Sequence, residues 1–240
     1  MRIVRVGGGW LANREAYLWT AICAVVLAVL VAAAISRDAF VAGATVMVGL
    51  VIARPIGRRL LNVRKGRLGE RLITDLLRRL PDDYLLVNDV MVGGMRGNAD
   101  HVLIGPCGVL VIETKRLAGK IRCDGDIWYV KDYRRRSISR QVNAGAAAVR
   151  RFLSSRHQDI GFVESVVVFT HPLCQLEVKR PKTIVVRYSE LLQLVLDLAK
   201  RNRMRPGLAE ELARSLHAGE DIGSGRVLRS PLRSSAARPV

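Results

Sequence analysis

The chain has 240 residues, 50% of them hydrophobic, and carries a formal net charge of +18. This length leaves room for one mid-sized domain and an additional segment. Its four cysteines show no C-x-x-C pair and no zinc-type spacing with histidine, which argues against a disulfide framework or a zinc site and suits a reducing cytoplasm. The basic balance favours nucleic acid or an anionic membrane surface as partner, although positive charge can also serve only membrane topology and solubility.

The first part of the chain predicts two membrane-spanning helices. Residues 17–35 are apolar and uncharged over about 19 positions, which is long enough for a helix to cross a bilayer. A polar loop at 36–38 interrupts the run, and a second apolar run follows at 39–53. The glycines of the second run, Gly43 and Gly49, suit close helix contact. Two spans joined by so short a loop predict a hairpin whose two ends lie on the same side of the membrane.

Basic residues flank this hairpin at both outer ends, whereas its loop holds one Arg and one Asp. The positive-inside rule therefore predicts a multi-pass protein of the inner cell membrane, with the N-terminus and the following domain in the cytoplasm. The alternative is a cleaved signal peptide, because the alanines at 32–34 resemble a processing site. The flanking residues are Arg2, Arg5 and Arg14 before the pair, and Arg54, Arg58, Arg59, Arg64, Lys65 and Arg67 after it.

Apolar periodicity after the hairpin predicts a mixed α/β sheet flanked by helices. The expected order is a helix ending at Pro81, three strands with further short strands, a helix, two strands and two helices. The expected strands cover 84–91, 99–104, 109–115, 120–122, 127–130, 162–170 and 183–186, and the later helices cover 137–155, 188–203 and 207–216. The predicted division is 1–16 N-terminal segment, 17–54 hairpin, 55–66 basic juxtamembrane linker, 67–216 soluble domain and 217–240 disordered basic tail.

Two carboxylates stand out in the predicted β-hairpin at 99–115. If Gly105 faces Gly108, the register places Asp100 opposite Glu113, about 5 Å apart on a largely apolar face. Two partly buried negative charges need a positive partner, which Lys115 or a hard divalent cation could supply. The alternative is an ordinary carboxylate–lysine ion pair at the rim of a sheet.

Several ordered motifs resemble those of the NERD (nuclease-related domain) family of the PD-(D/E)XK nuclease superfamily, over residues 67–169. One departure from the superfamily pattern is Ala99, which stands where the superfamily name gives proline. A proline at this position would take no part in the chemistry. The motifs are Gly69-Glu70, Asp100-His101-Val102, Gly108-Val109, Ile112-Glu113-Thr114-Lys115, Gly119-Lys120-Ile121, Trp128 and Gln141. The resemblance implies a restriction-endonuclease-like mixed sheet and a site that uses Mg²⁺ or Mn²⁺, with no small-molecule cofactor.

The resemblance also implies a role for each site residue. Glu70, Asp100 and Glu113 correspond to the metal ligands, and Lys115 corresponds to the residue that orients or activates the attacking water. Gln141 corresponds to a polar residue that reaches the site from a later helix. The alternatives without a role in function are that Glu70 is a solvated carboxylate and that Gln141 hydrogen-bonds to the backbone.

Taken together, the residues predict a membrane-anchored, metal-dependent nuclease that hydrolyses phosphodiester bonds in DNA. DNA would contact a basic surface mainly through its backbone, since no base-reading motif is visible. A non-catalytic module of nuclease fold that holds nucleic acid or a protein is the alternative, and a homodimer stays open. The basic surface comprises Arg116, Lys120, Lys131, Arg134, Arg135, Arg136, Arg150 and Arg151. Trp128 is expected in the core rather than as a base-stacking platform.

Overall fold

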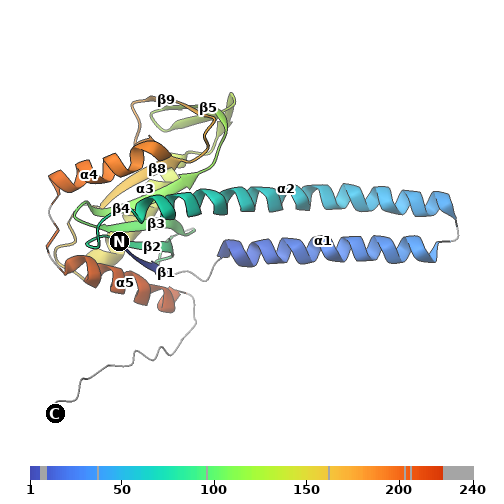
Figure 1. Ribbon diagram of the computed structural model, residues 1–240, viewed down its shortest axis with the longest axis horizontal. Helices are drawn as coiled ribbons and strands as arrows, with labels where there is room; N and C mark the ends of the chain where they lie inside the picture. Colours follow the sequence, from blue (N-terminus) through green and yellow to red (C-terminus); the bar gives the residue numbers. More distant parts are fainter. Residues whose placement is uncertain are drawn as a thin grey trace, which may run out of the picture.

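The computed structural model describes residues 1–5, 10–36, 38–95, 97–161, 163–202, 204–205 and 207–223. A long antiparallel helix pair projects from a mixed α/β domain (Figure 1). The predicted fold class, a mixed sheet flanked by helices after an apolar hairpin, is therefore confirmed. Of the predicted tail, 217–223 continue helix α5 (Leu208–Gly223), and 224–240 lie outside the described residues.

Helices α1 (Trp10–Ile35) and α2 (Ala39–Leu77) form the helix pair. Asp38 caps the start of α2, because its carboxylate accepts a hydrogen bond from the Phe40 amide at 2.7 Å. Helix α2 continues through Pro55 and through the predicted linker at 55–66. Arg and Leu, both strong helix formers, dominate that stretch, and they carry the helix past the single hydrogen bond that proline removes. Its 39 residues make α2 about 58 Å long.

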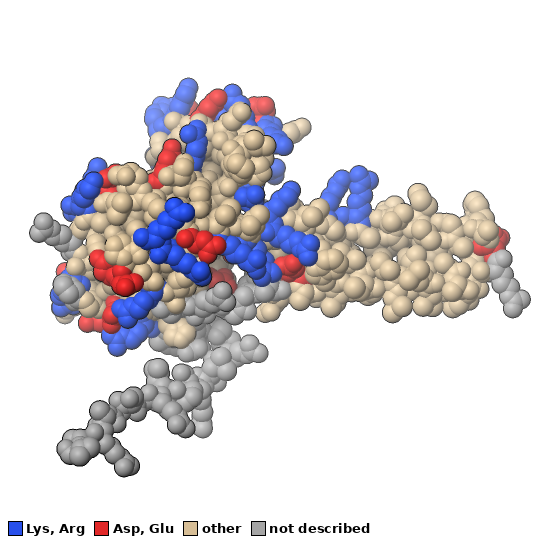
Figure 2. Space-filling view, viewed as in Figure 1, with Lys and Arg blue, Asp and Glu red and all other residues tan. Residues whose placement is uncertain are grey.

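The distal part of the helix pair exposes apolar side chains and almost no charge, in contrast to the basic side chains that gather near the domain (Figure 2). Both helices are long and apolar enough to span a membrane. A helix that is apolar on all sides suits an apolar surrounding rather than water. The exposed apolar residues include Val26, Leu27, Leu30, Val31, Met47, Val48, Leu50 and Val51.

Polar contacts hold the two helices together where they meet the domain. Glu15 of α1 pairs with Arg64 at 3.0 Å and also with Arg67, both on α2. The Arg64 guanidinium lies 5.2 Å from the centre of the Trp19 ring. A small apolar cluster of Leu18, Leu60 and Val63 lies beside these pairs. The junction is thus fixed by charge and by packing at the same place.

A short strand that the sequence patterns did not predict begins the chain. Strand β1 (Arg2–Arg5) pairs in parallel with β2 (Leu85–Val90). Its Arg2 also forms an ion pair with Glu210 of α5. Both ends of the helix pair therefore join the same α/β domain, which supports the predicted hairpin topology independently of the charge bias.

The main sheet has six strands in the order β1-β2-β3-β4-β8-β10. Strands β2, β3 (Ala99–Gly105) and β4 (Gly108–Lys115) are antiparallel neighbours, whereas β8 (Val163–Phe169) runs parallel to β4 and β10 (Ile184–Arg187) parallel to β8. The strand predicted at 183–186 is confirmed within one residue, and a 3-10 turn (Tyr188–Glu190) then leads into α4 (Leu191–Arg201).

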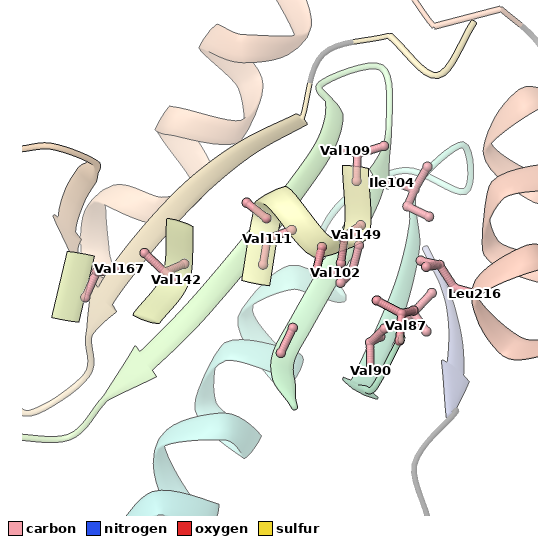
Figure 3. Packing of buried hydrophobic residues seen from close by; sticks show 14 of the residues in the cluster. Val87, Val90, Val102, Ile104, Val109, Val111, Val142, Val149, Val167 and Leu216 are labelled. Atoms are coloured by element: carbon pink, nitrogen blue, oxygen red, sulfur yellow. The ribbon is translucent and has the colours of Figure 1, made fainter. Parts of the chain in front are cut away.

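Helices cover both faces of this sheet. On one face, α3 (Ile138–Ser154) and α5 pack against a core that includes Val102, Val111 and Val167 (Figure 3). On the other face, α2 and α4 pack against a core that includes Leu103 and Ile112. The central strands are buried on both sides, which explains why their sequences are almost continuously apolar.

A second sheet of four strands, in the order β7-β6-β5-β9, extends beside the main one. It contains β5 (Gly119–Asp124), β6 (Ile127–Val130), β7 (Tyr133–Arg135) and β9 (Cys174–Lys179). Strands β7 and β9 were not predicted. Trp128 of β6 is fully buried and donates a hydrogen bond to Ser139 Oγ at 2.8 Å, so its predicted place in the core is confirmed.

Helix α2 approaches the end of β4 closely at Gly69. A Cβ atom there would lie 3.0 Å from Thr170 Oγ1 and 3.1 Å from Thr114 Cγ2. We expect Gly69→Ala to lower the free energy of unfolding by about 1–3 kcal/mol, because the methyl group must push the helix away from the strand. Chemical unfolding of the full chain in detergent measures the change.

The matched control is Gly66→Ala, on the same helix, where an added Cβ meets nothing within 4 Å. The free energy of unfolding of that variant should rise by about 0.5–1 kcal/mol, because alanine has a better helix propensity than glycine. Equal effects of the two substitutions would show that the close approach at Gly69 does not matter.

Candidate functional site

The five residues singled out from the sequence come from four elements that meet at one end of the main sheet. Asp100 lies on β3, Glu113 and Lys115 lie on β4, Glu70 lies on α2 and Gln141 lies on α3. Gly69 allows α2 to approach β4 there, which brings Glu70 to the strand end. The structure therefore brings together all five.

The register of β3 and β4 is the predicted one. Gly105 pairs with Gly108, and the ladder runs back to His101 opposite Ile112. Beyond that pair the ladder ends, and the Thr114 amide instead donates a hydrogen bond to Asp100 Oδ2 at 2.7 Å. The Asp100 side chain thereby takes the place of a backbone acceptor and stays tied to β4.

Glu113 is the best-partnered of the carboxylates. It is 4% exposed, and its Oε1 atom accepts hydrogen bonds from Lys115 Nζ and, at 2.7 Å, from Gln141 Nε2. Lys115 Nζ also lies 3.4 Å from Gln141 Oε1. The Gln141 amide is thus oriented by both neighbours, and the three side chains form one connected polar group across β4 and α3.

The other two carboxyl groups hold their protons unusually strongly. Burial, together with the charges of Asp89 and Glu113, raises the pKa of Glu70 to about 7, although Arg67 and Lys115 act in the opposite direction. Burial and the charges of Glu113 and Glu70 raise the pKa of Asp100 well above its usual value, against the Thr114 amide hydrogen bond. Burial is the largest cause of both shifts, so each carboxyl group resists ionisation unless a cation approaches it.

Asp89 is an acidic neighbour of the site that the sequence patterns missed. It lies on β2 between Asn88, which pairs with His101, and Val90, which pairs with Ala99. Its backbone has a positive φ of 60°, which is uncommon outside glycine, and its carboxylate accepts a hydrogen bond from Asn98. The signal that could have marked it is a polar Asn-Asp pair inside an otherwise apolar strand.

His101 lies next to Asp100 in sequence but cannot supply the missing positive charge. It is 1% exposed, and burial lowers the pKa of its imidazole to about 3, so the ring is neutral near pH 7. Its Nδ1 atom lies 2.7 Å from Asn88 Oδ1. His101 therefore fixes β3 against β2.

A cleft of about 890 Å³ opens beside Glu113 and Gln141. Four arginines line it, at positions 134, 135, 136 and 140, together with apolar residues of β4, α3 and the loop before β3. Three of these arginines belong to the predicted basic surface. Others of that surface are engaged elsewhere: Arg116 donates to the Thr170 carbonyl oxygen, and Lys120 pairs with Glu177 at 2.9 Å.

The carboxylates do not form a ready-made metal cage. No group of three or more acidic, histidine or cysteine side chains in the described ranges is already arranged to hold a metal ion. Lys115 and the Thr114 amide bind oxygens of Glu113 and Asp100 instead. The donor set still fits Mg²⁺, which binds through one or two carboxylates, keeps several waters and takes the remaining oxygens from a phosphate. Such a cation would offset the cost of ionising these buried carboxyl groups.

Comparison with known proteins agrees with this geometry. Residues 65–170 match the family model described as nuclease-related domain, NERD. Neither the curated proteins nor the solved structures give a match. The matched segment begins on α2 before Glu70 and ends after β8, so it contains all five site residues and Asp89. The chain therefore carries a nuclease-related (NERD) domain at residues 65–170, directly continuous with an apolar helix pair.

Proposed function

We propose that this protein is a membrane-anchored nuclease that depends on a divalent metal ion and hydrolyses phosphodiester bonds in DNA. The observation that carries the proposal is the cluster of Glu70, Asp100 and Glu113 around a single lysine, beside a cleft lined by arginine. The nuclease-related domain supports the same chemistry.

The residues of the chain divide the work as follows. Glu70, Asp100 and Glu113 would hold Mg²⁺ or Mn²⁺ with their carboxylate oxygens. When bound, this ion would lower the pKa of the attacking water and neutralise charge that develops on the phosphate. Lys115 Nζ donates hydrogen bonds and would orient the water or a phosphate oxygen, while Gln141 holds Glu113 and Lys115 in place. One chain supplies every residue, so the mechanism requires no second copy.

The membrane anchor is the helix pair. Its exposed apolar surface and its length support two transmembrane spans, and β1 and α2 bring both ends to the same domain. Exposed arginines at positions 54, 58 and 59 follow the second apolar run, which by the positive-inside rule supports a cytoplasmic position of the domain at the inner membrane.

A non-catalytic module that holds nucleic acid or protein is the second candidate. It is favoured by the absence, within the described residues, of a preformed group of three metal-binding side chains and by the direct ion pair of Glu113 with Lys115. A domain of nuclease fold without catalytic activity could keep that ion pair because it stabilises the fold. The two candidates differ in whether DNA is cut.

Cleavage of plasmid DNA tests the proposal. The full chain in detergent should nick or linearise plasmid with Mg²⁺ or Mn²⁺ and should do nothing when the metal is chelated. We expect Glu113→Gln and Lys115→Ala each to lower the rate at least about 100-fold, since each removes charge that acts on the transition state. Cleavage that persists in both variants would remove the catalytic assignment, and binding without cutting at any metal concentration would favour the non-catalytic module.

Stability should depend on pH in a direction set by Glu70. Because its pKa in the folded protein is about 7, above the usual 4.5, the folded state binds more protons than the unfolded state in this range. Without metal, stability should therefore fall as pH rises from about 5 to about 7. Added Mg²⁺ should restore it at pH 8 by binding the deprotonated group. Thermal unfolding with chelator and with Mg²⁺ measures both effects, and Glu70→Gln should reduce the pH dependence; a wild-type profile that is flat or rises with pH would contradict this.

A further inference from the structure

The cleft beside Glu113 combines two surfaces of different chemistry. Three of its lining residues are the exposed arginines Arg134, Arg135 and Arg136, on β7 and the turn before α3, which we call the wall. Other lining residues are apolar or small and include Met95 from the loop before β3, Ile127 at the start of β6 and Gly145 of α3, which we call the floor. Ile127 is 44% exposed, so part of this apolar surface is open to solvent.

Several basic side chains on or beside the second sheet are engaged in ion pairs: Lys120 with Glu177, Arg122 with Asp132 and Arg180 with Asp124. Arg140, which also lines the cleft, pairs with Asp126 at 2.6 Å. Within the described part of the chain no ion pair involves Arg134, Arg135 or Arg136, and all three are exposed. The arginines of the wall therefore carry positive charge that no ion pair within the described residues offsets.

We propose that the cleft binds an unpaired nucleic-acid strand, with phosphates on the three arginines and bases against the apolar floor. This inference rests on the proposed nuclease function and narrows its substrate class. It places the strand beside Glu113 and Gln141, which border the same cleft.

The apolar floor is the reason for choosing an unpaired strand over a duplex. A duplex hides the faces of its bases by stacking and presents mainly phosphates and base edges, so it cannot use an apolar floor. A volume of about 890 Å³ is within the range of pockets that enclose small organic molecules, and it suits a few nucleotides rather than a double helix. Splayed bases of single strands bury their faces against apolar groups and guanidinium planes.

Charge alone predicts the opposite preference. Duplex DNA has the higher charge density, so a surface that only attracts phosphates should bind a duplex at least as well as a single strand. Tighter binding of the single strand would therefore show a contribution of the apolar floor and not of the arginines. Because the two surfaces predict opposite preferences, binding measurements can test the inference without any cutting.

The experiment measures fluorescence anisotropy of a short labelled DNA strand, either alone or annealed to its complement. The protein is the full chain in detergent with metal chelated, so that neither probe is cut. We expect the single strand to bind about tenfold more tightly than the duplex at equal ionic strength, because the face of at least one base can be buried against the apolar floor.

Two sets of variants separate the wall from the floor. Replacing Arg134, Arg135 and Arg136 by glutamine should weaken single-strand binding at least about tenfold. The logarithm of the binding constant falls linearly with the logarithm of the salt concentration, and each phosphate that an arginine neutralises on a single strand adds about 0.7 to that slope. The triple substitution should therefore also reduce the slope by about 2. The control replaces three exposed arginines at the end of α2 and on α4, on the opposite side of the main sheet, and should change binding little. These control positions are Arg78, Arg79 and Arg201.

Gly145 tests the floor. A Cβ at this position meets only Met95 Cε at 3.6 Å and Val111 Cγ1 at 3.9 Å, so Gly145→Ala should fold. Gly145→Leu should fill the floor and abolish the preference for the single strand while leaving duplex binding unchanged. Thermal unfolding shows whether the leucine variant is folded; if it is not, the arginine variants decide alone.

The outcomes distinguish this inference from the proposed nuclease function. Equal or tighter binding of the duplex, no binding of either probe, or an arginine variant that behaves like its control would each overturn the inference. Single-strand binding that needs the wall, without cutting at any metal concentration, would support the inference and remove the nuclease. Metal-dependent cutting without a single-strand preference would support the nuclease function and overturn the inference.

Discussion

The burial of three carboxyl groups beside one lysine, at the end of β3 and β4, is the constraint on which the candidate site depends. Burial makes charged carboxylates costly, and three of them, with Asp89 nearby, share one lysine. The raised pKa values of Glu70 and Asp100 show how the protein tolerates the cluster without another cation, by keeping protons. A divalent ion bound by these carboxyl groups would displace their protons, and that exchange would link the fold to the proposed chemistry.

Helix α2 joins the apolar helix pair and the candidate site in one continuous helix. The same helix carries the second apolar run, the exposed arginines that follow it and Glu70. From Arg54 to Glu70 the helix rises about 24 Å, so the site would stand at a nearly constant height above the membrane surface. Glu15 holds α1 against Arg67, a cation that also acts on the pKa of Glu70, and β1 ties the other end of the pair into the sheet. Substrate would therefore have to come close to the membrane.

The sequence was sufficient to predict the structure wherever the interactions that determine it are local. The glycines of the turn fix the register of β3 against β4, and the apolar alternation then places Asp100 near Glu113. Features that depend on distant partners could not be predicted from it. Strand β1 has only four residues and finds its partner about 80 positions later, and the charged strand β9 is held by β5 rather than by its own pattern. The position of Asp89 depends on a left-handed backbone that no composition rule marks.

The central claim is that the carboxylate cluster exchanges protons for one divalent ion. Isothermal titration calorimetry of Mn²⁺ into the full chain at pH 7, repeated in buffers of different ionisation enthalpy, measures the number of ions bound and of protons released. We expect one ion per chain with release of about one proton or more, and loss of binding in Asp100→Asn. Absence of binding, or binding that releases no proton and survives Asp100→Asn, would contradict it.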